Sequence, residues 1–198
     1  MTPHSMIERM TSRWVIRAGR RGGAVGPGSG VTERLYWPSW FFAALLTGIV
    51  GGFMLGHALI LARFLDWLLL SGVPALGQAY PTFRGSAGQS GLDAYYAVAG
   101  LQVIGTSAFL VLSLVARRHR TAAVIAGAAG ALWIAIHYAS GFGALEAAVL
   151  RGAGPISRDL AGRFVGWNVP IHIFHAVTLA VALSALLSVP LTALRRRG

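Results

Sequence analysis

The chain has 198 residues, of which 55% are apolar and only 12% are charged. Water-soluble domains carry about 25% charged residues, so this composition excludes an ordinary soluble globule and predicts a chain solvated by lipid. Cysteine is absent, which excludes disulfides, thiolate metal sites and cysteine-based catalysis. All 17 basic residues are arginine and they give a formal net charge of +11. Because the arginines gather at the ends of apolar runs, we expect them to face lipid phosphates and not nucleic acid.

Residues 1–34 form a basic segment ahead of the first apolar run. Ser5 and Glu8 have the spacing of a helix capping box, and apolar side chains recur every four residues over 6–14. This pattern predicts a short amphipathic helix on an anionic membrane surface. The alternative is a disordered basic leader, which the Gly-rich run 19–30 favours. The first apolar run begins too late and is too long for a cleavable signal peptide.

Four uncharged stretches are each long enough to cross the membrane, for which a helix needs about 20 residues. Backbone groups find no water at that depth, so each stretch must be helical. The predicted spans are residues 37–62, 94–116, 121–141 and 169–194. We therefore expect an all-α fold, a polytopic four-helix membrane bundle over residues 35–198.

The distribution of arginine predicts the orientation of the bundle. Twelve of the 17 arginines lie in the N-terminal segment, in the loop after the second span and in the C-terminal tail. Positively charged flanks stay on the cytoplasmic side, so both termini are predicted to be cytoplasmic, in the inner membrane of a bacterium. The two outer loops contain apolar pieces. We expect residues 67–76 to lie in the interface or to dip back toward the bundle, and residues 143–150 to continue the third helix.

Four histidines are predicted to lie at one depth. At 1.5 Å per residue, His57 is about 30 Å up the first span and His137 about 24 Å up the third. His172 and His175 lie in the first two turns of the descending fourth span and share one helical face. We therefore expect all four imidazoles in the outer half of the bundle.

This convergence favours a metal centre, because neutral imidazole binds iron, copper and zinc, and polar groups in a membrane are costly unless they are paired or functional. We predict that His57, His137, His172 and His175 ligate a non-haem iron or copper ion. Haem b with two axial histidines is the alternative cofactor, and zinc would do no redox chemistry. The structural alternative is a set of hydrogen-bonded helix contacts.

Three further residues are candidates for contacts with a cofactor, namely Tyr138, Trp167 and Asn168. Tyr138 is adjacent to His137, and Trp167 and Asn168 come just before Pro170. In that arrangement an asparagine caps a helix and a proline occupies its first turn. The structural interpretation is therefore an interfacial anchor at Trp167 and a helix cap at Asn168.

Acidic residues on the same side could complete the coordination or orient a ligand: Asp66, Asp93 and Glu146. Asp66 also has the spacing of a salt-bridge partner for Arg63. On a continued third helix, Glu146 would face away from His137. Met54 would suit copper, although simple packing explains it as well.

Small residues predict how the helices pack. Glycines that permit close approach of backbones occur in the first and third spans: Gly48, Gly51, Gly52, Gly56, Gly127 and Gly130. We therefore expect the first and third helices to pack tightly against each other.

The glycines of the first span and the stretch 163–177, RFVGWNVPIHIFHAV, resemble the anthrone-oxygenase-like family of small four-helix membrane proteins. Members commonly show an Arg and a Trp ahead of a His-Ala-Val-like last helix, echoed here by Arg163, Trp167 and His175. Their Asn-Val-Pro-like turn follows the third helix, whereas it opens the fourth here. The resemblance implies oxygen-dependent oxidation of a lipophilic, aromatic or quinone-like substrate.

The leading functional hypothesis is an integral membrane oxidoreductase that oxidises a lipophilic molecule arriving from the lipid. The alternatives are a haem b electron-transfer subunit and a non-catalytic structural subunit that binds other membrane subunits. A transporter is disfavoured, because the sequence shows no inverted repeat and no charge midway through a span.

Overall fold

The computed structural model describes residues 27–71, 89–151 and 156–195, and the regular structure in these residues is helical. The elements are α2 (Pro27–Gly56), the π-helix η1 (His57–Leu61), α3 (Ala62–Leu70), α5 (Gln89–Val115), α6 (Arg120–Ala139), α7 (Phe142–Arg151) and α8 (Arg158–Arg195). The amphipathic helix predicted before residue 27 lies outside the described residues.

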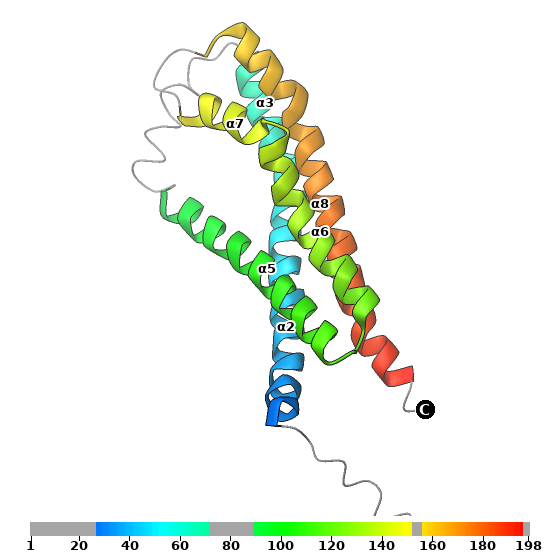
Figure 1. Ribbon diagram of the computed structural model, residues 1–198. Helices are drawn as coiled ribbons and strands as arrows, with labels where there is room; N and C mark the ends of the chain where they lie inside the picture. The colour runs from blue at the N-terminus through cyan, green and yellow to red at the C-terminus, as the bar shows by residue number, and fades with distance from the viewer. Residues whose placement is uncertain (1–26, 72–88, 152–155, 196–198) are drawn as a thin grey trace, which may run out of the picture.

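Within the described residues, four helical segments are long and apolar enough to cross a membrane: Gly30–Leu70, Gln89–Val115, Arg120–Ala139 and Arg158–Leu194. The chain is therefore a multi-pass membrane protein with an all-α fold, as the sequence predicts. The first segment is one rod in which α2, η1 and α3 follow each other without a break (Figure 1). Residues 67–70 extend this rod as part of α3, and residues 72–76 of the predicted interfacial piece lie outside the described residues.

The fourth segment begins at Arg158, well before the predicted start at residue 169. Pro170 lies inside α8, so the prediction that Asn168 caps the helix and Pro170 occupies its first turn is wrong. A proline ring crowds the carbonyl four residues earlier, here that of Gly166, and membrane helices tolerate such positions because neighbouring groups satisfy the freed backbone. Asn168 therefore has its side chain available for contacts between helices.

The long helices form a ring of neighbours. α2 packs along α5 and α8, and α6 packs along the same two helices. The predicted tight pairing of the first and third spans is wrong, because α2 and α6 lie diagonally across the bundle. Their glycines instead admit side chains of other helices. Gly51 of α2 lies against Leu179 of α8, and Gly130 of α6 lies against Gln102 and Thr106 of α5.

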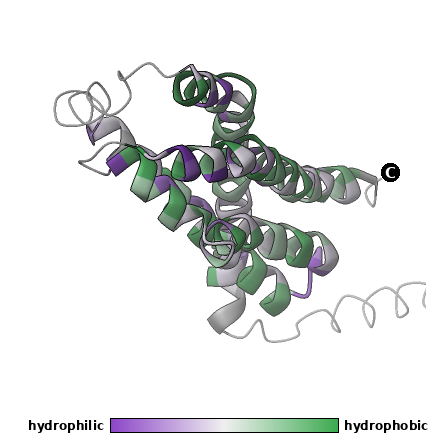
Figure 2. Ribbon diagram, turned by 90° about the horizontal axis from the view of Figure 1, so that it is seen from above, coloured by the Kyte–Doolittle hydropathy of each residue, from purple (hydrophilic) through white to green (hydrophobic). Residues whose placement is uncertain are grey.

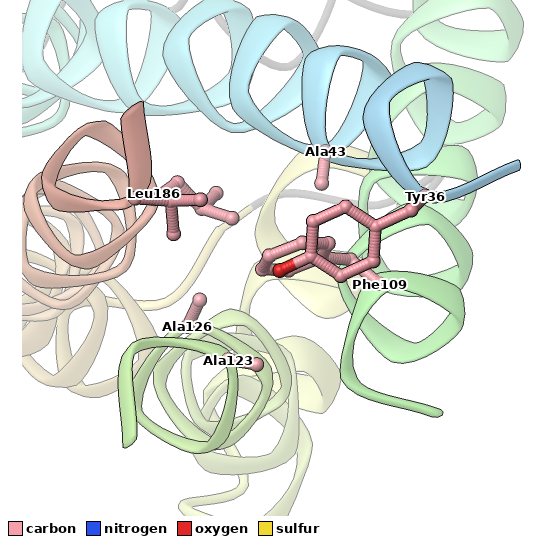
Figure 3. Close-up of a cluster of buried hydrophobic side chains, with 7 residues drawn as sticks. Tyr36, Ala43, Phe109, Ala123, Ala126 and Leu186 are labelled. Atoms are coloured by element: carbon pink, nitrogen blue, oxygen red, sulfur yellow. The ribbon is translucent and has the colours of Figure 1, made fainter. Parts of the chain in front are cut away.

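One end of the bundle, where α8 ends and the α5–α6 turn lies, is closed by an apolar core. Figure 3 shows Tyr36 and Phe109 facing small side chains of the neighbouring helices, and their ring centroids are 5.5 Å apart. Ala123 and Ala126 are fully buried and let α6 come close. We call the opposite end, where α3 and α7 lie, the α7 end (Figure 1).

The outer surface of the long helices is apolar, as Figure 2 shows by hydropathy. Large hydrophobic side chains are exposed on every long helix, among them Phe41, Ile60, Ile104, Leu132 and Val181. Such exposure is expected of helices that face acyl chains, because lipid is as apolar as the side chains themselves. The buried polar side chains are consequently the ones that call for explanation.

Candidate functional site

The structure brings the four predicted histidines together inside the bundle. His57 on η1 stacks on His172 of α8, with ring centroids 3.9 Å apart and planes 21° apart. His172 is followed by His175 at 5.7 Å, and His175 by His137 of α6 at 5.5 Å. The four imidazoles thus form one connected cluster of rings from three membrane-spanning segments, which we call the histidine cluster.

Local structure positions each of these rings. His172 and His175 are one helical turn apart on α8 and are both buried. His57 is the first residue of the π-helix, a wide turn that is rare and occurs frequently at functional sites. His137 lies in the last turn of α6, just before the chain turns into α7.

Hydrogen bonding fixes one ring and leaves others without partners. His172 Nδ1 lies 2.7 Å from the carbonyl oxygen of Asn168, so this nitrogen carries the proton and Nε2 is left as an acceptor. His57 Nε2 and both ring nitrogens of His175 are buried and have no hydrogen-bond partner in the described part of the chain. Buried polar atoms of native proteins are rarely orphaned, so these nitrogens make the histidine cluster the candidate site of the bundle.

Asn168 links two helices beside the histidine cluster. Its side-chain amide donates to the carbonyl oxygen of Ala62 at 3.1 Å and to Asp66 Oδ1 at 2.8 Å. Asp66 is thus held by α8, and no ion pair with Arg63 occurs among the described residues. Asn168 thus holds Asp66 through its side chain and His172 through its main-chain carbonyl.

Glu146 lies next to His137, contrary to the sequence prediction that it faces away. The third helix does not continue. α6 ends at Ala139, with Ser140 as its C-cap, and Gly141 has a left-handed backbone with φ of +78°. Phe142 N donates to Ser140 Oγ at the start of α7. The fold-back places Glu146 Oε2 3.7 Å from His137 Nε2. Burial raises the pKa of Glu146.

A buried polar row that the sequence analysis missed adjoins His175. The Trp133 ring meets the His175 ring edge-on at 5.5 Å, and Trp133 Nε1 donates to Gln102 Oε1 at 3.1 Å. Gln102 Nε2 in turn donates to Thr47 Oγ1 at 3.3 Å. One signal could have found it, because Gln102 is the single side-chain amide in the predicted span 94–116.

Other candidates lie farther from the histidine cluster or face outward. Tyr138 is 65% exposed and meets His137 only edge-on, at 5.1 Å. Met54 is buried and its sulfur accepts from the Tyr95 hydroxyl at 3.8 Å, which supports a packing role. Asp93 is exposed and accepts a hydrogen bond from its own helix. Trp167 is 52% exposed and lines a pocket at the surface.

The histidine cluster is not a preformed metal site. Across residues 27–71, 89–151 and 156–195, no three His, Asp or Glu side chains stand in an arrangement that could hold a metal ion. Stacking of His57 on His172 gives one reason, because the nitrogen lone pairs lie in the ring planes and parallel rings cannot both point at one ion. Coordination would therefore require at least one ring of the pair to rotate.

No protein-family model matches the chain, and neither does any curated protein or solved structure. The resemblance to the anthrone-oxygenase-like family consequently depends only on the short motifs described above.

Proposed function

We propose that the histidine cluster binds a transition-metal ion and that the chain is an integral membrane oxidoreductase acting on a lipophilic molecule. The observation that carries the proposal is the meeting of four buried imidazoles, with orphaned nitrogens on His57 and His175. An unsatisfied buried polar group costs about 1–3 kcal/mol, which packing alone does not return.

The energetic scale supports ring rotation on binding. An off-rotamer side chain costs about 1 kcal/mol, whereas a metal held by protein ligands contributes on the order of 10 kcal/mol. Rotation of His57 or His172 out of the stack is therefore a small cost beside the gain. Imidazole ligands suit iron and copper, and either ion would supply electron exchange when bound.

The surrounding residues have defined tasks under this proposal. His57, His137, His172 and His175 would hold the ion, and the main-chain carbonyl of Asn168 fixes the tautomer of His172 that leaves Nε2 as the nitrogen that would bind. Glu146, 3.7 Å from His137, would orient that ring. The hydrophobic bundle excludes water from the cluster, and a lipophilic molecule would reach it from the lipid.

The packing favours a non-haem ion over haem b. A porphyrin between His57 and His172 would need the two rings on opposite faces of a macrocycle, but their centroids are 3.9 Å apart. The distribution of arginine supports a position of the cluster in the outer leaflet of a bacterial inner membrane, with both termini cytoplasmic.

The test is the metal content of the purified protein. We expect near-stoichiometric iron or copper by elemental analysis and no Soret band in the absorption spectrum. His175→Ala should lose the metal. The matched control is His119→Asn, which alters a histidine at the other end of the bundle where asparagine tolerates the left-handed backbone (φ 45°), and it should retain the metal.

Other outcomes assign the chain differently. A Soret band would identify a haem b electron-transfer subunit. Protein that binds neither haem nor metal, even after incubation with ferrous or cuprous ions, would contradict the proposal and leave the histidine cluster as a packing element of a non-catalytic membrane subunit.

A further inference from the structure

A pocket of about 490 Å³ opens on the surface of the bundle at the α7 end. The α6–α7 turn and α7 form one wall, and the first turns of α8 form the other. Small-molecule sites in proteins have volumes of roughly 300–1,000 Å³, so this pocket is large enough for a small ligand or for the head group of a larger one.

The length of α6 places the pocket at the boundary of the membrane. α6 has 20 residues and is therefore about 30 Å long, which equals the thickness of the hydrocarbon core. Ser140 and Gly141 directly follow this helix and line the pocket. Trp167 lines the opposite wall and is 52% exposed, as is typical of tryptophan at the level of lipid head groups. The pocket consequently opens where the head groups of the bilayer lie.

Arg163 gives the pocket its charge. It is the single charged residue among the described residues that line the pocket, and its Nε atom lies 3.2 Å from Asp159 Oδ2, one helical turn earlier. The two side chains are 64% and 80% exposed, and exposed pairs of this kind contribute little. Both groups can therefore take new partners. A guanidinium binds phosphate, and a carboxylate accepts hydrogen bonds from an ammonium group.

Three side chains of α8 stand in the order of the parts of a phospholipid. Asp159, Arg163 and Trp167 are four residues apart, so each step is about 6 Å along the helix axis. Toward the membrane the chain thus presents a carboxylate, then a guanidinium and then an indole. In phosphatidylethanolamine the ammonium group is outermost, a two-carbon link joins it to the phosphate, and the glycerol esters and acyl chains follow. The order of charges is complementary.

Two glycines of α8 leave room for the apolar part of such a lipid. Gly162 and Gly166 lie one turn apart and both line the pocket. A Cβ atom added at either position would meet nothing within 4 Å, so the packing of α8 does not require glycine there. Larger side chains at these positions would occupy the pocket.

We propose that this pocket binds one molecule of phosphatidylethanolamine. The phosphate contacts Arg163, the ammonium group contacts Asp159, and the upper part of an acyl chain passes over Gly166 beside Trp167. A zwitterionic head group satisfies both charges at once. Phosphatidylglycerol has no cation for Asp159, and the quaternary ammonium of phosphatidylcholine has no N–H to donate to it. The site does not include the histidine cluster, so it is independent of the proposed metal.

The test is native mass spectrometry of the full chain in neutral detergent, titrated with these three lipids carrying identical acyl chains. We expect one saturable site for phosphatidylethanolamine. The other two lipids should bind about two- to fivefold more weakly, the range for one exposed charge pair. Equal affinity for phosphatidylcholine would overturn the proposal. So would tighter binding of phosphatidylglycerol, which would identify a site for negative charge alone.

Gly166→Leu tests the location. The added side chain occupies the pocket and should weaken phosphatidylethanolamine at least about tenfold. Gly52→Leu is the matched control, since Gly52 is an exposed helical glycine on α2 with equally open surroundings, and it should bind as the unaltered chain does. Equal affinities of the two variants would overturn the proposal. Circular dichroism establishes that each variant is folded.

Two further variants separate the charges. Arg163→Gln should weaken phosphatidylethanolamine and phosphatidylcholine by the same factor, because both carry the phosphate. Asp159→Asn should abolish the preference between these two lipids and turn the preference toward phosphatidylglycerol. Asp93→Asn is the matched control, because Asp93 is an exposed acid of α5 that accepts a hydrogen bond from its own helix. A preference for phosphatidylethanolamine that is unchanged in Asp159→Asn would contradict the assignment of the ammonium group to Asp159.

Discussion

The link between Asp66 and Asn168 makes a quantitative prediction about stability. Asn168→Leu keeps a side chain of similar size but removes the donors to Asp66 Oδ1 (2.8 Å) and to the Ala62 carbonyl (3.1 Å). Hydrogen bonds between membrane helices contribute about 0.6 kcal/mol on average and at most about 1.7. Removing two such bonds, one of them to a carboxylate, should lower the free energy of unfolding by about 1–3 kcal/mol.

The assay is reversible unfolding of the purified chain in mixed micelles, followed by circular dichroism as the fraction of denaturing detergent rises. Thr178→Val is the matched control on the same helix, because among the residues that the structure describes the Thr178 hydroxyl bonds only to the Phe174 carbonyl of α8 itself, at 2.8 Å. We expect this control to change the free energy of unfolding by less than about 0.5 kcal/mol. If Asn168→Leu unfolds at the same fraction of denaturing detergent as the control, the hydrogen bonds of Asn168 to Ala62 and Asp66 do not hold α3 against α8.

Further predictions concern pH and packing. Burial raises the pKa of Glu146 above its ordinary value of 4.5, so the ionised carboxylate costs the folded chain free energy at neutral pH. The contribution of Glu146 to stability should therefore rise as pH falls from the raised pKa toward 4.5, so the advantage in melting temperature of Glu146→Gln over the unaltered chain should shrink over the same range in a series of melting curves. A Cβ atom at Gly130 would lie 2.9 Å from Gln102 Nε2 and from Thr106 Oγ1, so Gly130→Ala should destabilise the bundle by about 1–3 kcal/mol in the same unfolding assay. Gly100→Ala, with no atom within 4 Å of the added carbon, should be neutral or slightly stabilising.

Hydropathy alone predicts the membrane-spanning helices, because about 20 apolar residues in a row have few other stable solutions. The heights of His57 and His137 also follow from sequence, since every helical residue advances the chain by about 1.5 Å. Hydropathy and helical rise do not predict how each helix is rotated about its own axis or which helices pack against one another. Rotation and pairing depend on side-chain contacts, which is why the pairing of α2 with α5 and α8 was not foreseen.

Local exceptions to helical geometry account for the remaining errors. Pro170 predicts a helix start, yet α8 runs through it, so Asn168 does not have the capping role that the sequence predicts. Gly141 is the last residue of the predicted span 121–141, and residues 143–150 were expected to continue that helix. Its left-handed backbone ends α6, and nothing in the hydropathy pattern distinguishes it from the tolerated helical glycines such as Gly127.

Two carboxylates show how the same spacing is resolved in two ways. Asp66 follows His57 by nine residues, and Glu146 follows His137 by nine. On an uninterrupted helix, nine residues place two side chains about 180° apart, so neither carboxylate could share a face with its histidine. In the first segment the π-helix absorbs about one extra residue and reduces the angle to about 80°. His57 and Asp66 consequently both reach α8, at His172 and at Asn168.

In the third segment, α6 ends before Ser140 and Gly141, so α7 folds back and brings Glu146 next to His137. A π-helical turn and an interrupted helix each cost stability, and packing of the bundle alone does not require them. Both bring a carboxylate close to the histidine cluster.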